Sequence, residues 1–259
     1  AMIQAGFDHA AAQAAVHEST AKKESTDSTG AVTADGTPGE YGYDTSPVAT
    51  GNVIKAGDKH VNVLARYARP EVILFGNVLT DDECDEMIER SRNRLRPSTV
   101  VNLETGADDI ITSRTSQGIS FDRGEDELIA RIERRFAELM NCPVDHGEGL
   151  QILNYAVDGK YLPHFDYFPP GRAGSNVHFG RGGQRVATLI AYLNDVPAGG
   201  ETVFPEIGMS VAPRRGNAVY FRYMNRAGQL DPSTLHGGAP VTQGEKWIMT
   251  KWVRERTYG

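Results

Sequence analysis

Residues 246–254, which read KWIMTKWVR, decide the fold. The stretch is rich in β-branched and aromatic residues, which favours a β-strand. Because successive side chains of a strand point to opposite faces, Lys246 and Trp252 would share one face, while Trp247 and Met249 would share the other. If the first face looks into a barrel, Lys246 becomes an inward-pointing cation, and a buried cation requires a negative partner. The alternative is a lysine that merely reaches back to solvent at the start of the strand.

Working outward from this strand, four more segments have the same character: Leu150–Tyr155, Val186–Asn194, Met209–Ala212 and Ala218–Tyr223. Glycine- and proline-containing connections separate them. Two helices are predicted upstream, at Asp81–Leu95 behind a Thr80–Glu83 capping box and at Glu125–Met140, each with an apolar stripe at helical spacing. Helices followed by many short strands indicate a mainly β, α+β protein. Its core would be a double-stranded β-helix, of the jelly-roll or cupin-like type, with helices packed on one sheet.

The chain has 259 residues, enough for one large domain, which we place at 46–259. Residues 1–45 are rich in Ala, Ser, Thr and Gly and cannot bury much apolar surface, so we expect disorder or loose packing there, with a short helix across Ala10–His17. The net charge of −7 argues against a nucleic-acid partner, and the arginine run from Arg90 to Arg96 reads as a solvated face.

Two further sequence features concern the compartment. No run of about 18 apolar residues is present, so no membrane span is predicted. The two cysteines, Cys84 and Cys142, form no C-x-x-C pair or zinc spacing and do not suggest a disulfide-stapled secreted domain. We therefore expect a cytoplasmic protein.

A possible metal site is formed by His164-Phe165-Asp166 and the distant His236. In an extended strand His164 and Asp166 point to the same face, so they can meet one ion. A lone histidine is usually structural, and an isolated His-x-Asp occurs often by chance. Together, however, two histidines and one carboxylate are the protein ligands of non-haem Fe(II) sites, which leave positions open for a substrate and O2. The absence of an H-E-x-x-H helix argues against a zinc hydrolase.

Lys246 follows the distal histidine by ten residues and could pair with the far carboxylate of 2-oxoglutarate. Tyr155 is the last residue of one predicted strand, and Thr188 lies within another. Both could add neutral hydrogen bonds to the same carboxylate, although either could instead have only a packing role in the sheet. The Gly-rich, polar stretch 169–184 follows the His-x-Asp pair, and we interpret it either as a lid over a peptide groove or as a plain surface loop.

These residues, in their order, resemble the prolyl 4-hydroxylase catalytic domain. The resemblance rests on Tyr155, the segments 164–168, 182–188, 192–194, 199–202 and 235–237, and Gly244–Trp247, and it extends upstream to Arg114-Thr115-Ser116. It covers residues 60–256 and is strongest to the compact bacterial members. It implies iron ligands His164, Asp166 and His236. It also implies that Lys246 binds 2-oxoglutarate with help from Tyr155 and Thr188, that Arg185 and Arg114 face the substrate, and that Tyr161 and Trp252 lie near the iron.

The expected function is therefore an Fe(II)- and 2-oxoglutarate-dependent dioxygenase that hydroxylates peptidyl proline, using O2 and releasing succinate and CO2, with ascorbate as reductant. One alternative is a hydroxylase of a free amino acid, a lysyl residue or another small molecule on the same scaffold. A non-catalytic metal-binding module is a second. Iron-dependent halogenation would need a small residue in place of Asp166. Expected partners are a proline-containing peptide or protein and, because compact family members can dimerise, a second copy of the chain.

Overall fold

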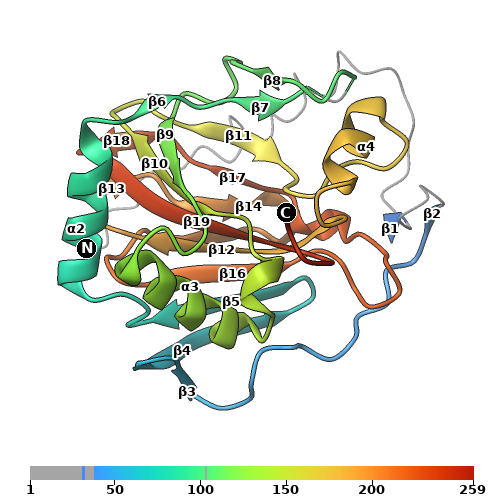
Figure 1. The fold of residues 1–259 in the computed structure, drawn as a ribbon, viewed down its shortest axis with the longest axis horizontal. Coiled ribbons are helices and arrows are strands. Elements are labelled where there is room, and N and C mark those ends of the chain that lie inside the picture. Colours follow the sequence, from blue (N-terminus) through green and yellow to red (C-terminus); the bar gives the residue numbers. More distant parts are fainter. Residues whose placement is uncertain (1–30, 33–37, 103) are drawn as a thin grey trace, which may run out of the picture.

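The computed structural model describes residues 31–32, 38–102 and 104–259. Nine strands form one large sheet in the order β3-β4-β5-β16-β12-β19-β10-β9-β6, and four form a smaller sheet in the order β11-β17-β14-β15. All strand pairs in these two sheets are antiparallel. The predicted double-stranded β-helix core is confirmed, and Figure 1 shows the helices α2 and α3 outside the large sheet.

The large sheet contains β3 (Val53–Ala56), β4 (Lys59–Ala68), β5 (Glu71–Gly76), β6 (Arg96–Pro97), β9 (Gln117–Phe121), β10 (Leu150–Tyr155), β12 (Arg185–Tyr192), β16 (Ala218–Arg222) and β19 (Lys246–Arg254). The small sheet contains β11 (Tyr161–His164), β14 (Thr202–Phe204), β15 (Met209–Val211) and β17 (His236–Gly238). Short pairs are β1 (Ala31–Val32) with β2 (Pro38–Gly39), β7 (Val100–Val101) with β8 (Asp108–Asp109), and β13 (Ala198–Gly199) with β18 (Val241–Gln243). The helices are α2 (Asp81–Arg92), α3 (Glu127–Met140), α4 (Ala173–Phe179) and the 3-10 turns η1 (Val144–His146), η2 (Pro205–Ile207) and η3 (Pro232–Thr234).

Two apolar clusters follow from the alternation of side chains along the strands. One lies between the large sheet and the helices, where Phe136 and Ile132 of α3 join Trp247 and Met249 of β19. The other lies between the two sheets and includes Ile248, from the opposite face of the same strand. Strand β19 therefore divides a helix-facing core from a sheet-facing interior, as its sequence pattern predicted.

The two predicted helices are confirmed, and α2 begins with the expected capping box: Glu83 N donates to Thr80 Oγ1 at 3.1 Å and Thr80 N donates to Glu83 Oε2 at 3.0 Å. Strands β10 and β19 have the predicted bounds. Strands β3–β5 were not predicted, because much of β4 is exposed and lacks a regular apolar alternation. The stretch 169–184 contains the helix α4, which the loop interpretation did not include.

The predicted boundary near residue 45 falls within a stretch that packs on the domain. Gly42 N donates to Gln229 Oε1 at 2.9 Å, and Asp44 pairs with Arg222. The expected helix across Ala10–His17 lies outside the described residues, as does most of the segment expected to be disordered. No helix in the described part of the chain is long and apolar enough to cross a membrane.

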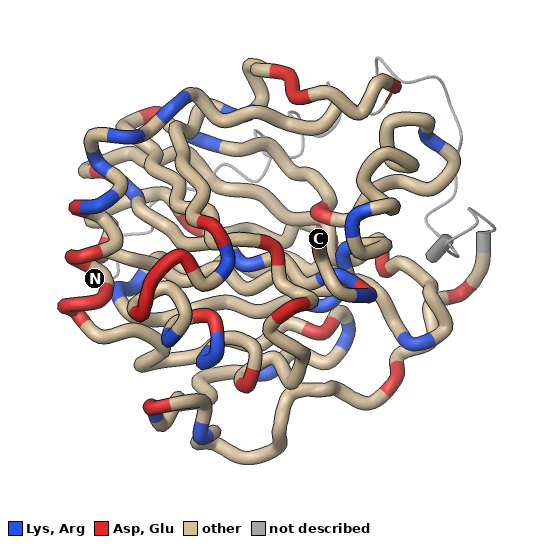
Figure 2. The backbone as a smooth tube through the Cα atoms, in the orientation of Figure 1, with Lys and Arg blue, Asp and Glu red and all other residues tan. Residues whose placement is uncertain are grey.

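Figure 2 shows acidic and basic residues interspersed around α2 and α3. Arg90 pairs with Glu86 at 2.6 Å and also contacts Asp126. Arg92 lies 3.7 Å from Glu245 and over the Trp247 ring. These two members of the arginine run thus have acidic partners close by, which supports its interpretation as a solvated face.

Candidate active site

The three predicted metal ligands meet between β11 and β17. His164 ends β11 and pairs in register with His236, the first residue of β17. A Cβ at Gly237 would lie 2.9 Å from Tyr161 O, so glycine lets the two strands approach closely there. One ligand atom from each of His164, Asp166 and His236 lies within 4.8 Å of the others.

The orientation of both imidazoles suits a metal. Nδ1 of His164 lies 2.9 Å from Leu162 O, and Nδ1 of His236 lies 3.0 Å from Thr234 O. Because a carbonyl only accepts, each Nδ1 carries the proton and each Nε2 offers a lone pair. The two Nε2 atoms flank Asp166, at 3.5 Å from Oδ1 and 3.6 Å from Oδ2. Backbone carbonyls that fix the ring tautomer are typical outer-shell partners of metal-binding histidines.

The charge states fit the same interpretation. Burial by itself opposes ionisation of Asp166, but the nearby His236, His164 and Arg185 hold its pKa well below the usual range. Burial lowers the pKa of His236 to about 4, so this imidazole is neutral at physiological pH. One carboxylate and neutral imidazole nitrogens form the donor set that a divalent iron ion requires.

Thr188 occupies a different place from the predicted one. Its hydroxyl donates to Asp166 Oδ2 at 2.6 Å and lies 3.2 Å from Tyr223 OH, and its side chain is fully buried behind Asp166. Strand β12 turns Thr188 toward the carboxylate rather than toward the cavity wall formed by Lys246 and Tyr155. We therefore replace the predicted contact of Thr188 with 2-oxoglutarate by a role in orienting Asp166.

Lys246 points into the interior, as its strand pattern predicted. It is 3% exposed, and burial lowers its pKa to about 8. Its Nζ lies 5.5 Å from the centroid of the Tyr155 ring and 5.9 Å from that of Tyr192. No acidic side chain forms an ion pair with Lys246 within residues 39–102 and 104–259. The site thus presents a buried cation that is available to an incoming anion.

The same end of the cavity includes a residue that the sequence reasoning did not assign. Thr202 lines the cavity, accepts a hydrogen bond from Tyr192 OH at 2.8 Å, and pairs with Gly238 across the small sheet. A Cβ on Gly238 would lie 3.8 Å from Lys246 Nζ, so Thr202 is close to the lysine. The only sequence signal was its place in the Gly199–Thr202 motif.

A cavity of about 1050 Å³ extends from Lys246 past the three ligands. Its outer walls include the β7–β8 region (Val100, Val101, Asp108) and the segment from Phe165 to Pro169. Tyr161 also lines it and stacks on His164, with ring centroids 3.6 Å apart. Trp252 lines it from β19, and its buried Nε1 has no hydrogen-bond partner among the described residues. Both aromatic residues therefore line the same cavity as the three predicted ligands, and their role toward the substrate stays a prediction.

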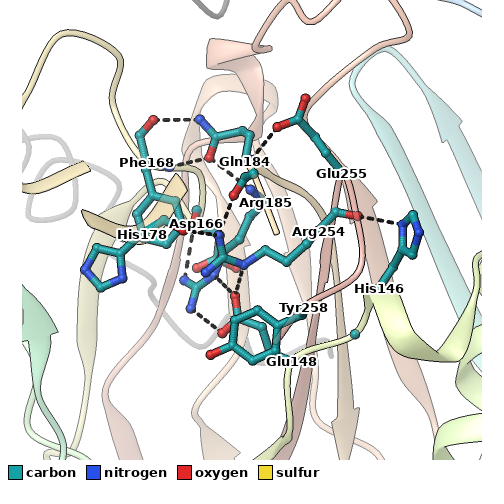
Figure 3. A network of polar contacts seen from close by, with 12 residues as sticks. His146, Glu148, Asp166, Phe168, His178, Gln184, Arg185, Arg254, Glu255 and Tyr258 are labelled. Atoms are coloured by element: carbon teal, nitrogen blue, oxygen red, sulfur yellow. Dashed lines mark hydrogen bonds and ion pairs between the residues drawn. The ribbon is translucent and has the colours of Figure 1, made fainter. Parts of the chain in front are cut away.

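Arg185 borders the cavity and is held by a carboxylate that the sequence did not reveal. Its guanidinium forms two hydrogen bonds to Glu148, at 2.6 and 2.9 Å, and lies 4.0 Å from the centroid of the Trp252 ring. Figure 3 shows Arg254 converging on the same Glu148, at 2.7 Å. Burial alone would raise the pKa of Glu148, but the two arginines outweigh it and hold the pKa below its usual value.

Arg114 is buried beside Tyr155 and Tyr161 and has no carboxylate partner in the described part of the chain. It donates to Thr99 O at 2.7 Å, to Ser116 Oγ at 3.1 Å and to Gln151 Oε1 at 3.2 Å, and it lies 4.9 Å from the centroid of the Tyr161 ring. Arg114 therefore joins the β7 region to the cavity wall, and all its nitrogens are engaged within the protein.

Comparison with known proteins identifies the class of this site. Residues 150–254, which contain the three ligands and Lys246, match the 2OG-Fe(II) oxygenase superfamily. Structurally, the chain is similar to the 2OG complex of a viral collagen prolyl hydroxylase from Paramecium Bursaria Chlorella virus-1. That match has a TM-score of 0.55 and 27% identity and covers 71% of this chain and 95% of the viral one. The protein is a 2-oxoglutarate- and Fe(II)-dependent oxygenase.

Proteins that are similar to this chain in sequence identify its family within the superfamily. The chain is 40% identical over 223 residues to probable prolyl 4-hydroxylase 3 of Arabidopsis thaliana, covering 79% of this chain and 75% of the relative. It is 38% identical over 226 residues to prolyl 4-hydroxylase 5 of the same plant, covering 80% and 75%. The chain belongs to the prolyl 4-hydroxylase family. The expected closer resemblance of the chain to the compact bacterial members of this family stays a prediction.

Proposed function

We propose that the protein hydroxylates prolyl residues of a peptide or protein substrate while 2-oxoglutarate is converted to succinate and CO2. The observation that carries the proposal is the arrangement of the cavity. The metal ligands His164, Asp166 and His236 line one cavity together with the buried Lys246 and with residues of the β7–β8 region. This cavity would therefore receive a keto acid and a substrate residue beside the same metal.

His164, Asp166 and His236 would hold the Fe(II) ion through the two Nε2 atoms and the carboxylate. When bound, the iron supplies the oxidising chemistry with O2 and 2-oxoglutarate. The protein's own contribution is orientation. Thr188 fixes the carboxylate of Asp166, and two backbone carbonyls fix the imidazoles.

Lys246 would bind the distal carboxylate of 2-oxoglutarate. Glu201 contributes negative charge nearby but forms no ion pair with the buried ammonium group, so the cosubstrate would supply a direct counter-charge without displacing an internal carboxylate. Tyr155 and Thr202 line this end of the cavity and could supply neutral hydrogen bonds. Burial raises the pKa of Tyr155, which keeps its hydroxyl protonated and able to donate.

Arg185, Trp252 and Tyr161 would face the substrate. Glu148 holds the Arg185 guanidinium over the indole of Trp252, 4.0 Å from its centroid, so two large planar groups are fixed in the cavity that contains the metal ligands. Such fixed surfaces position the reacting carbon, which matters because orientation selects the carbon that reacts. The cavity, about 1050 Å³, has room for 2-oxoglutarate together with a substrate residue.

Mass spectrometry of proline-rich peptides incubated with Fe(II), 2-oxoglutarate and ascorbate tests the proposal. We expect the addition of one oxygen at the C4 position of proline, lost in His164→Ala and kept in His60→Ala, which removes an exposed histidine on β4. Free proline and lysyl peptides, run in parallel, test the alternative substrates. Succinate formation without oxidation of any prolyl peptide would refute the substrate class.

Two further expectations also stay proposals: a homodimer, which sedimentation would detect, and a cytoplasmic location. The second is consistent with two cysteines that are both free, Cys84 and Cys142.

A further inference from the structure

Asp231 is a buried carboxylate for which the proposed mechanism has no use. It is 1% exposed, and although no hydrogen bond of ordinary geometry reaches its Oδ2 from the described residues, the side chains of Tyr43 and Ser233 lie beside the carboxylate. Its Oδ1 accepts from Ser233 N at 2.9 Å, which caps the turn η3. A buried carboxylate is costly unless its neighbours hold it in place, and this one lies five residues before His236.

Hydrogen bonds connect the turn η3, which Asp231 caps, to the imidazole ring of His236. Thr234 Oγ1 donates to Asp231 O at 2.6 Å, and Thr234 N donates to the same carbonyl at 3.3 Å. The carbonyl of Thr234 in turn accepts from His236 Nδ1 at 3.0 Å. The backbone carbonyl of Asp231 therefore holds Thr234, whose own carbonyl orients the imidazole, and the Asp231 side chain fixes the Ser233 N–H of the same turn.

Residues 40–48, which we call the N-terminal strap, hold the same loop from outside. Gln229 accepts from Gly42 N at 2.9 Å and donates to Glu40 O at 2.8 Å. Asn225 Nδ2 donates to Gly42 O at 2.8 Å. These contacts join the strap to the loop between β16 and β17, across more than 180 residues of sequence.

The strap also brings tyrosines to Asp231. Burial, together with the nearby charge of Asp231, raises the pKa of Tyr43 to about 12. The charge of Asp231 also contributes to the raised pKa of Tyr41 in the strap and of Tyr167, three residues after His164.

We propose that Asp231 and the N-terminal strap are positioning elements for His236, and that they set the affinity of the site for its metal. The inference rests on the proposed role of His236 as a metal ligand. Outer-shell partners of ligating histidines typically contribute about 10–100-fold to metal affinity. Here the outer shell extends from the carbonyl of Thr234 through Asp231 to a segment that precedes the catalytic core in sequence.

The experiment measures the dissociation constant for Mn(II), as a redox-stable probe, by calorimetry on the full chain. Circular dichroism identifies a temperature at which each variant is folded. We expect Asp231→Ala to raise the Mn(II) dissociation constant by about tenfold or more. Gln229→Ala removes two of the bonds between the strap and the loop, leaves those of Asp44 and of Asn225 to Gly42 and does not touch the turn, so it should raise the constant less. Asp231→Asn keeps the Oδ1 acceptor for Ser233 N and should recover most of the affinity.

Ser46→Ala is the matched control, because Ser46 joins the strap to Glu71 of β5 and not to the loop. It should lower the thermal midpoint and leave Mn(II) binding unchanged. His164→Ala tests the metal site itself and should abolish binding. If His164→Ala loses Mn(II) while folded Asp231→Ala and Gln229→Ala bind it like the wild type, the positioning role is refuted and the metal site stands. If His164→Ala binds normally, the metal assignment fails first.

Discussion

Replacing Lys246 with methionine removes the buried cation while keeping a side chain of similar length. The wild-type ammonium group is 3% exposed and has no internal carboxylate partner in the described residues, so a bound dicarboxylate would be its main counter-charge. Two unit charges about 4 Å apart at an effective dielectric constant of about 20 attract by about 4 kcal/mol. Breaking a buried pair on one side costs about 3–5 kcal/mol.

We take about 3 kcal/mol as the loss, which corresponds to about a hundredfold weaker binding of 2-oxoglutarate. Calorimetric titration of the Mn(II)-loaded protein with 2-oxoglutarate measures it. Mn(II) affinity should not change, because Lys246 is not one of the three ligands. The control is Lys251→Met on the opposite face of β19, where Lys251 Nζ donates to Glu133 Oε1 at 2.6 Å.

That control should lower the free energy of unfolding and leave binding of the keto acid intact in the folded fraction, since Glu133 and not the cosubstrate loses its partner. The reasoning is refuted if Lys246→Met binds 2-oxoglutarate within a small factor of the wild type, or if Lys251→Met weakens that binding equally.

Three more results are expected. Burial lowers the pKa of Lys246 to about 8, so above pH 8 the lysine must take up a proton when 2-oxoglutarate binds. Calorimetric titrations across the pH range should therefore give a dissociation constant for 2-oxoglutarate that is constant below pH 8 and rises about tenfold per pH unit above it. Thr188→Val removes the hydrogen bond to Asp166 and should weaken Mn(II) binding by about tenfold; unchanged affinity would contradict an orienting role. Glu148→Gln leaves two arginines without their carboxylate and should lower the free energy of unfolding by about 3 kcal/mol in urea, whereas Glu245→Gln, at an exposed pair, should cost less than about 1 kcal/mol.

The parts of the fold that could be predicted are those that a local sequence pattern indicates. Strand β19 is rich in β-branched and aromatic residues, and α2 begins with a capping box, so each needs only neighbouring residues to be recognised. The metal ligands could be found because the His-x-Asp pair is local and His236 precedes Lys246 at a family spacing, although β11 ends at His164 and Asp166 lies beyond the strand on which it was predicted. Short-range geometry accounts for these successes.

The contacts that could not be predicted join residues far apart with no local pattern. Thr188 reaches Asp166 across 22 positions, and Glu148 reaches Arg185 across 37. Thr188 was predicted to contact 2-oxoglutarate, whereas its hydroxyl donates to Asp166. The strand pattern indicated which face of the sheet Thr188 lies on, but it could not identify the residue that this face contacts. Glu148 precedes β10 in a glycine-rich stretch, where nothing in the sequence marks it as the partner of two arginines.

Strand β19 has a consequence for how this enzyme can change over evolutionary time. Neighbouring positions alternate between the helix-facing core and the cavity, so Lys246 and Trp247 belong to different environments although they are adjacent in the chain. Substitutions at one position leave the other face untouched. A deletion of one residue within the strand would instead exchange the two environments, placing an indole where the keto acid binds and a charge beneath α3. Length is therefore more constrained here than composition, and insertions or deletions should be absent from this strand in functional variants.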